Sequence, residues 1–441
     1  MTSTTEKSEV GYNNVGMEIT TRNLGINRII LIGNGFDLSH GLKTKYENFY
    51  EWYWEQRFMG LKNTYEKVSD DGLCSYNISY LDIGFKSYIY QRGLTTEKDW
   101  KHIKVQIEND KAIIFRKDTL FFSNICKKIE TKGWVDIENE YYNLLKKYVI
   151  AEITTEERDR RIEELNNQLT ILKEKLIEYL SSISISEGLM KVDLSHKIYA
   201  PINKDEVAVN KIDTYYDHIE NWVNASDEEW DERYDMYKYS SFDKRNVVDL
   251  AHRNKQLERQ KLDEALCTQM DLYGRIRLPN RIMFLNFNYT PLADKYSKGT
   301  EGMSCVHIHG EISNPEHVIF GYGDEIDKTY QKLVDFNNND YLENIKSIQY
   351  NDEDNYHKVL DFVESAPFQI YIMGHSCGIS DRTLLNTLFE HKNCVSIKPF
   401  YHQFEDNTDN YRDLVKNISR NFTDMKLMRS LVVNKKYCET I

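Results

Sequence analysis

The stretch RIILIGNGFD, residues 28–37, decides the fold. Residues 28–32 are a short, mostly apolar run that stops at Gly33-Asn34-Gly35, and such a run is typical of a buried parallel strand. The next segment, residues 46–58 (YENFYEWYWEQRF), carries aromatic side chains at helical spacing. A strand, a glycine turn and a helix form the first half of a βαβ unit. The sequence therefore predicts an α/β fold that begins here.

The last third of the chain supplies the other predicted strands. Short apolar runs recur there and alternate with plausible helices at residues 383–391 and 411–422. This alternation favours a parallel sheet flanked by helices, in which ligands bind at the carboxyl ends of the strands. The predicted strands are residues 282–287, 304–308, 317–320, 369–373 and 395–397.

These two parts predict a discontinuous nucleotide-binding core, residues 27–60 plus 270–441, preceded by a flexible polar lead-in over residues 1–26. Residues 61–269 are expected to form a mainly helical insertion with a coiled-coil-like helix at about 154–181. An apolar stripe marks this helix and suits packing within the chain or against a partner helix. The stripe consists of Ile162, Leu165, Leu169, Leu172, Leu176 and Leu180.

Three segments of the insertion are less uniform. Residues 107–127 leave open whether they hold a strand or a helix pair, whereas residues 134–148 predict a helix with an acidic start and a basic end. The acidic cluster at residues 227–232 is typical of a solvated helix face. Residues 152–269 are our candidate regulatory or oligomerisation element.

Composition limits the classes of function. The net charge is −13, from 57 basic and 70 acidic residues, so binding to nucleic acid through a broad positive surface is disfavoured. Seven cysteines without a C-x-x-C pair indicate neither a zinc ribbon nor a disulfide framework. The polar stretch 1–27 lacks the apolar core of a signal peptide, and no run reaches the ~18 apolar residues of a membrane span. We expect a cytoplasmic protein without a membrane segment.

The glycine turn is the first candidate binding element. Gly33 and Gly35 would let the backbone approach a pyrophosphate, and the helix start near Phe36 would donate free N–H groups. The third glycine of G-x-G-x-x-G is absent, since its position holds Leu38, so an ordinary tight turn is the alternative. Asp37 would repel a phosphate unless it caps the helix or binds a ribose.

Polar residues close two further predicted strands. The Asn288 amide offers donors and an acceptor, which suits a ribose hydroxyl and a water, although asparagine also suits a turn. His307 and His309 share one strand face, and a neutral histidine at a strand end is suited to act as a general base. Structural or metal-binding roles are the alternatives, but no third metal ligand is evident nearby.

The segment Gly374-His375-Ser376-Cys377-Gly378 matches the G-x-S-x-G spacing of a hydrolase nucleophile turn. A nucleophilic Ser376 would need later acidic and histidine partners, for which Asp381, His391 and His402 are available. A glycine-rich loop after a strand is the simpler interpretation, and we favour it.

Taken in order, these segments resemble the AbiH family of bacteriophage abortive infection proteins. That family is in turn similar to sirtuin-type NAD-binding proteins, so the resemblance implies a Rossmann-like, sirtuin-like sheet. The segments that carry it are residues 28–49, 134–142, 284–290, 306–310, 374–381 and 428–438.

The resemblance also implies roles for individual residues. Asn288 and His309 fall at the catalytic asparagine and histidine of sirtuins, and Asp37 is placed to stabilise the cationic transition state. The implied nucleotide-binding residues are Gly33, Asn34, Gly35, Phe36, Gly310, Gly374, His375, Ser376 and Asp381. Asp136 and Glu138 would join the site if their helix folds over the cleft.

Three departures from the sirtuin pattern matter. Asp37 stands where a serine is usual, and Thr290 stands where an aspartate is usual. The four-cysteine zinc module is absent, which argues against protein deacylation.

The sequence therefore predicts an antiphage effector that hydrolyses NAD+, with NAD+ as its substrate and with no bound cofactor and no zinc. Its expected partners are further copies of the same chain, in a homo-oligomer, or a phage-derived trigger. Two alternatives remain: a non-catalytic nucleotide-binding sensor, and a metal-dependent phosphohydrolase or nuclease that uses Asp37, Glu138, Asp324 and Asp381.

Overall fold

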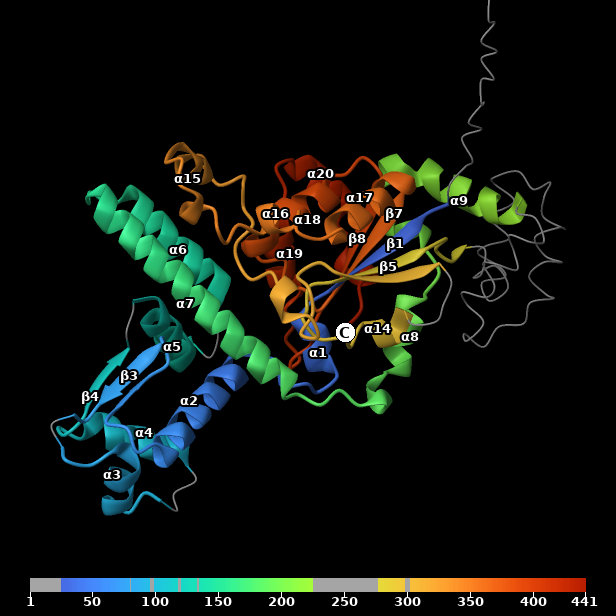
Figure 1. The fold of residues 1–441 in the computed structure, drawn as a ribbon. Coiled ribbons are helices and arrows are strands. Elements are labelled where there is room, and N and C mark those ends of the chain that lie inside the picture. Colours follow the sequence, from blue (N-terminus) through green and yellow to red (C-terminus); the bar gives the residue numbers. More distant parts are fainter. Residues whose placement is uncertain are drawn as a thin grey trace, which may run out of the picture.

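A five-stranded parallel sheet with helices on both faces organises the chain (Figure 1). The computed structural model describes residues 25–79, 81–95, 99–117, 120–132, 135–224, 277–297 and 302–441. The strand order is β6-β5-β1-β7-β8, which confirms the predicted α/β class. The strands are β1 Asn27–Ile32, β5 Ile282–Asn286, β6 Met303–His307, β7 Phe368–Met373 and β8 Cys394–Phe400.

The central strand β1 is buried along its whole length. Ile29 and Leu31 face one hydrophobic cluster, whereas Ile30 and Ile32 face another, as the two-residue period of a strand requires. One face is covered by α17 Asn355–Ser365, α18 Arg382–Phe389, α19 Tyr411–Arg420 and α20 Met425–Leu431. The other is covered by α1 Asn34–Ser39, α8 Val192–Ile198 and α14 Asp294–Ser297.

The strand predicted at residues 317–320 is wrong. A 3-10 turn, Pro315–His317, occupies its start, and Val318 and Phe320 are buried without joining a strand ladder. The backbone N–H of Ile319 donates instead to the carbonyl of His309 at 2.9 Å. The connection is apolar because Ile319 and Phe320 pack into the two hydrophobic clusters on either side of it. A short apolar run does not distinguish such a buried connection from a strand.

The segment around α8, which the sequence assigned to the insertion, packs against the parallel sheet. The Arg28 guanidinium, which has no exposed surface, donates to the Ile198 carbonyl at 2.7 Å and to Gln369 Oε1 at 3.0 Å. Gln369 donates onward to Glu206 at 3.0 Å. A buried arginine needs such partners, so this network holds the residues near 198–206 on the sheet. These residues contact the sheet although the sequence assigned them to the insertion, and the boundary predicted at residue 269 lies outside the described residues.

A second body lies beside the sheet, at the lower left of Figure 1. It combines helices with a three-stranded antiparallel sheet of order β2-β3-β4. Its strands are β2 Val68–Asp70, β3 Cys74–Asn77 and β4 Ile114–Lys117. Its helices are α2 Tyr46–Asn63, α3 Phe85–Gln91, α4 Trp100–Asn109, α5 Leu120–Lys132, α6 Ile137–Ile150 and α7 Thr155–Ser181.

The boundary predicted at residue 60 falls inside α2. Phe49, Trp54 and Phe58 on this helix are buried in the cluster of the second body, so their aromatic pattern reflects packing against the insertion. Residues 107–127, which the sequence left open, hold β4 followed by the start of α5.

Helix α7 begins and packs as the sequence indicates. Thr154 caps it by accepting a hydrogen bond from the Glu157 N–H at 3.3 Å. The whole apolar stripe is buried in the second body, which confirms packing within the chain. Figure 1 shows the carboxyl end of α7 reaching toward α1.

The other α-helices of the described residues are α9 Ile212–Asn224, α15 Tyr330–Asp335 and α16 Lys346–Gln349. In the described part of the chain, no helix is long and apolar enough to cross a membrane. The lead-in up to residue 24 and the acidic cluster at 227–232 lie outside the described residues.

Candidate functional site

A cavity of about 470 Å³ lies at the carboxyl edge of the parallel sheet. The loops after β1, β5, β6 and β7 form one side of it, and the second body closes the other through Asp136 and Glu138 at the start of α6. This volume is in the range of small-molecule sites. The cavity collects ten of the predicted residues: Gly33, Asn34, Gly35, Asp37, Asn288, His309, Gly374, His375, Ser376 and Asp381.

Two predicted nucleotide-binding residues do not line this cavity. The Phe36 ring is fully buried and packs edge-on against Tyr296, with ring centroids 5.4 Å apart. Gly310 has a φ of 73°, and a Cβ there would lie 2.4 Å from the His317 carbonyl oxygen. Phe36 is therefore a core residue, and Gly310 shapes the turn that follows His309.

The two glycines of the first turn serve close packing between loops. A Cβ on Gly33 would lie 2.4 Å from the Cα of His375, and one on Gly35 would lie 2.8 Å from the Cα of Gly374. The N–H groups of Gly33, Gly35 and Phe36 all donate to backbone carbonyls at 2.8–3.2 Å. The prediction of free N–H groups at the helix start near Phe36 is therefore wrong for Gly35 and Phe36, because their N–H groups already donate to the Gly374 and Gly33 carbonyls.

Asp37 lies at the floor of the cavity with both oxygens occupied. The Asn288 amide donates to Oδ1 at 2.9 Å, and the Thr290 hydroxyl donates to Oδ2 at 2.6 Å. The same amide also donates to the Gly33 carbonyl at 3.0 Å. Burial raises the pKa of Asp37 to about 6, against the opposing effect of these two hydrogen bonds. The carboxylate is thus predominantly ionised at neutral pH and has a fixed orientation.

A buried lysine joins the second body to the sheet. The side chain of Lys346 has no exposed surface, and its Nζ lies 2.7 Å from Asp381 Oδ1 and 3.0 Å from Glu138 Oε2. Glu138 also accepts from the Gly321 N–H at 3.2 Å. The helix that carries Glu138 therefore folds over the cavity, as the sequence suggested. Lys346, the first residue of the short helix α16, was missed because a lone lysine gives no sequence signal.

Lys346, Asp381 and Glu138 differ in how strongly the cluster holds their charges. Burial alone would lower the pKa of Lys346, but the two carboxylates raise it to about 12. Against the effect of burial, Lys346 and His309 hold the pKa of Asp381 well below its usual range. Burial raises the pKa of Glu138 to about 7, although Lys346 opposes the rise. Asp381 is therefore the fixed negative charge, and Glu138 is the carboxyl that accepts a proton first.

Both histidines of the cavity contact Asp381. His309 Nε2 lies 3.2 Å from Asp381 Oδ1 and 3.3 Å from the Tyr350 hydroxyl. His375 Nε2 lies 3.5 Å from Asp381 Oδ2, while its Nδ1 accepts from the Cys377 N–H at 3.1 Å. Burial, together with Lys346, lowers the pKa of His309 to about 4, so a neutral imidazole faces the cavity.

The two histidines predicted on one strand face do not act together. β6 ends at His307, whose Nε2 lies 2.9 Å from Asp294, away from the cavity. His309 lies two residues beyond the strand end and faces Asp381. The alternation rule fails here because it holds only as long as the strand continues.

The nucleophile interpretation of Ser376 does not fit the structure. His391 lies just before β8, at the opposite edge of the sheet, where its Nε2 is 3.2 Å from Glu364. Within the residues that the structure describes, Ser376 makes no hydrogen bond to a histidine. Its loop is a glycine-rich turn, with φ of 79° at Gly374 and 52° at Cys377.

The four acids of the phosphohydrolase alternative do not converge on one ion position. Asp37 accepts from an amide and a hydroxyl, whereas Glu138 and Asp381 share the Lys346 ammonium. Asp324 faces the Arg382 guanidinium at 3.4 Å. Each of the four carboxylates is thus already paired with a hydrogen-bond donor or a cation of the protein.

A second cavity, of about 700 Å³, adjoins the first. The two share the loop at residues 374–376 and the side chain of Lys45. The second cavity also includes Lys43 and the aromatic rings of Phe400 and Phe404. Its lining also includes Glu47 and Asp413, so it offers aromatic surface and side chains of both charges next to the carboxylate-rich site.

Comparison with known proteins gives one match. A family model described as "Bacteriophage abortive infection AbiH" matches residues 29–403, which include the strands, the cavity and the second body described above. No curated protein and no solved structure matches the chain.

Proposed function

The chain belongs to the AbiH family of bacteriophage abortive infection proteins, and from this premise we propose that it acts by hydrolysing NAD+. In this reaction water adds to C1′ of the nicotinamide ribose, nicotinamide leaves, and ADP-ribose and a proton are released. The observation that carries the proposal is the convergence of Asp37, Asn288, His309 and Asp381 on one cavity.

The strand order supports a sirtuin-like nucleotide site. The chain builds outward from β1 through β5 to β6, and then returns to the other side of β1 with β7 and β8. The reversal opens a crevice at the carboxyl ends on either side of β1, which is where dinucleotides bind in sheets of this order. The cavity occupies this crevice.

Two of the three departures from the sirtuin pattern, Asp37 and Thr290, compensate each other. Thr290, in place of an aspartate, donates to Asp37, in place of a serine, at 2.6 Å. The hydroxyl and the carboxylate have thus exchanged positions, and Asn288 donates to the same carboxylate. A fixed acid beside the asparagine is retained, although it comes from the first turn instead of the second strand.

The charges suit cleavage of a glycosidic bond. As nicotinamide leaves, positive charge develops on the ribose, and the ionised carboxylates of Asp37 and Asp381 stabilise it from fixed positions. The hydrogen bond to Asp381 orients the His309 imidazole, which accepts a proton from the ribose hydroxyl or the attacking water. Asn288 holds the ribose next to Asp37. These side chains carry out the chemistry without a bound cofactor.

The phosphates need cations that the glycine turn does not supply. Lys45 lines both cavities and is exposed at their junction, so its ammonium can neutralise a pyrophosphate that bridges them. The nicotinamide ribose would then occupy the first cavity. The adenosine would occupy the second, against Phe400 and Phe404.

The decisive experiment measures cellular NAD+. We would express the wild type, Asn288→Ala and His309→Ala in a bacterium at equal protein level, and follow NAD+ by mass spectrometry before and after phage infection. We expect NAD+ to fall with the wild type and with His357→Ala, an exposed histidine on α17, and to stay constant in the two site variants.

Protection against phage with unchanged NAD+ would refute the proposal. In that case, binding of ADP-ribose to the purified protein without turnover would favour the nucleotide-binding sensor.

A further inference from the structure

A separate group of metal-binding side chains lies behind the strand that leads to Asn288. It comprises Asp294 on α14 together with Cys305 and His307, which are alternate residues on β6. One ligand atom from each lies within 4.8 Å of the other two. Neither the cavity nor the proposed hydrolysis uses these three side chains.

The three atoms converge on a point and do not form a proton relay. His307 Nε2 lies 2.9 Å from Asp294 Oδ2 and 3.8 Å from Cys305 Sγ. In a nucleophilic triad the two ring nitrogens serve different partners, whereas here both partners face Nε2. Ligand atoms around tetrahedral zinc lie roughly 3.3–3.6 Å apart, as its bond lengths to sulfur, nitrogen and oxygen require. The two distances from His307 Nε2 bracket that range, and the third, between Asp294 and Cys305, is within 4.8 Å, so an approach of these side chains would complete the site.

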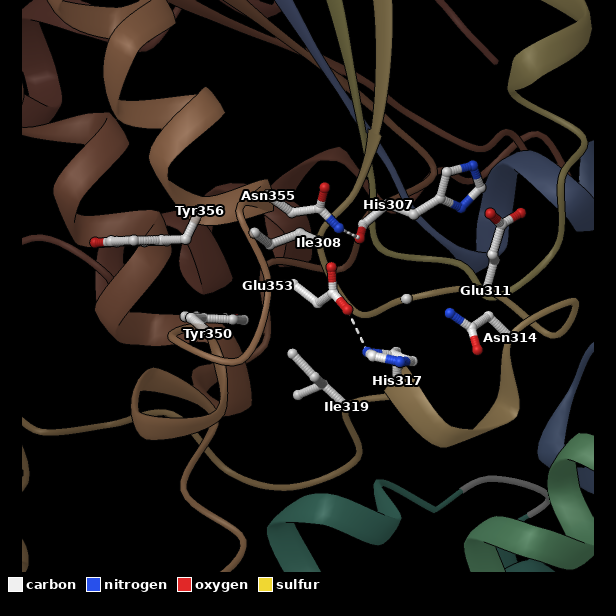
Figure 2. A pocket seen from close by; sticks show the side chains of 11 residues that line it. His307, Ile308, Glu311, Asn314, His317, Ile319, Tyr350, Glu353, Asn355 and Tyr356 are labelled. Atoms are coloured by element: carbon white, nitrogen blue, oxygen red, sulfur yellow. Dashed lines mark hydrogen bonds and ion pairs between the residues drawn. The ribbon is translucent and has the colours of Figure 1, made fainter.

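The surroundings suit an ion that exchanges with solvent. The Asp294 side chain is 30% exposed and that of His307 is 10% exposed. Glu311 and His307 both line a neighbouring pocket of about 140 Å³, whose lining residues Figure 2 labels. The ring also hydrogen-bonds to the backbone of Asn288, and such contacts orient metal-binding histidines.

We propose that Asp294, Cys305 and His307 bind one zinc ion, with a water at the fourth position. One thiolate, one imidazole and one carboxylate form a mixed donor set that zinc accepts readily. The site differs from the four-cysteine module that the sequence lacks, and it stands independently of NAD+ cleavage. Its ion clamps β6 to α14 and thereby steadies the loops that carry Asn288 and His309.

Metal titration of the full-length protein tests this assignment. After treatment with a chelator, zinc would be titrated in competition with a chromophoric chelator, and cobalt would serve as the spectroscopic probe. We expect one ion per chain and a thiolate-to-cobalt charge-transfer band. Cys305→Ser should abolish the band, and both Cys305→Ser and the isosteric Asp294→Asn should weaken zinc binding at least tenfold. Cys438→Ser, which changes a remote cysteine, should leave both unchanged.

Two results would overturn the proposal: no stoichiometric binding by the wild type, or equal binding by the wild type and Cys305→Ser. Thermal unfolding in chelator separates ligand loss from misfolding. Metal-free variants should unfold at the temperature of the metal-free wild type, and only the wild type should gain stability on adding zinc.

Discussion

Replacing Thr290 with valine tests whether Asp37 acts as a carboxylate. The substitution removes the hydroxyl that donates to Asp37 at 2.6 Å while nearly preserving the shape of the side chain. A hydrogen bond to a charged group contributes about 1.5–3 kcal/mol, and one pKa unit corresponds to about 1.4 kcal/mol. The pKa of Asp37, about 6 in the wild type, should therefore rise by roughly one to two units.

The direction of the expected change in rate depends on which protonation state of Asp37 is active. Only the ionised carboxylate stabilises a cationic ribose, so a higher pKa moves the acidic limb of the pH–rate profile to higher pH. At pH 7 the ionised fraction should fall from about 0.9 to between about 0.5 and 0.1. The rate at that pH should fall about two- to tenfold and recover near pH 9.

The assay is nicotinamide release by purified protein between about pH 5 and pH 9. Thr170→Val, on the exposed side of α7, is the matched control and should keep the wild-type profile. An equal loss of rate at every pH, or an acidic limb that does not move, would refute the role assigned to Asp37.

Three further substitutions test other parts of the site. Lys346→Met leaves two buried carboxylates without their cation and should reduce the free energy of unfolding in urea by about 3–5 kcal/mol; exposed Lys332→Met should change it little, and equal effects would contradict the role of the cluster. Gly33→Ala places a Cβ 2.4 Å from the His375 Cα and should lower stability by about 1–3 kcal/mol, measured the same way; an unchanged value would refute the close packing. Lys45→Ala should raise KM for NAD+ about tenfold with kcat nearly unchanged, whereas a loss confined to kcat would exclude phosphate binding.

The sequence predicted the carboxyl edge of the sheet well, for a physical reason. Strands buried on both faces leave short apolar runs, and the polar residues that end them must gather at one edge. Asn288 and His309 follow such runs and do meet Asp37 there. The same logic placed the loop at residues 374–376 correctly.

Other features depend on contacts that no local pattern encodes. Lys346 reaches the site from the start of α16, where neither its spacing nor its sequence neighbours mark it. Its burial is explained only by its two acidic partners. The aromatic side chains of α2 indicated a helix but not which body it packs against. At the helix start that was predicted to have free N–H groups, Gly35 donates to the carbonyl of Gly374, which lies far away in the sequence.

The long-range bonds of β1 also determine when, during translation, the cavity can form. The Gly33 carbonyl receives its bond from Asn288, 255 residues later, and Arg28 bonds to Gln369, 341 residues later. A chain emerges from the ribosome starting at its amino terminus, so β1 is synthesised first. Its neighbouring strands β5 and β7 exist only after most of the chain has been translated. Asp381 lines the cavity, so we expect a chain that ends upstream of this residue to lack the proposed activity.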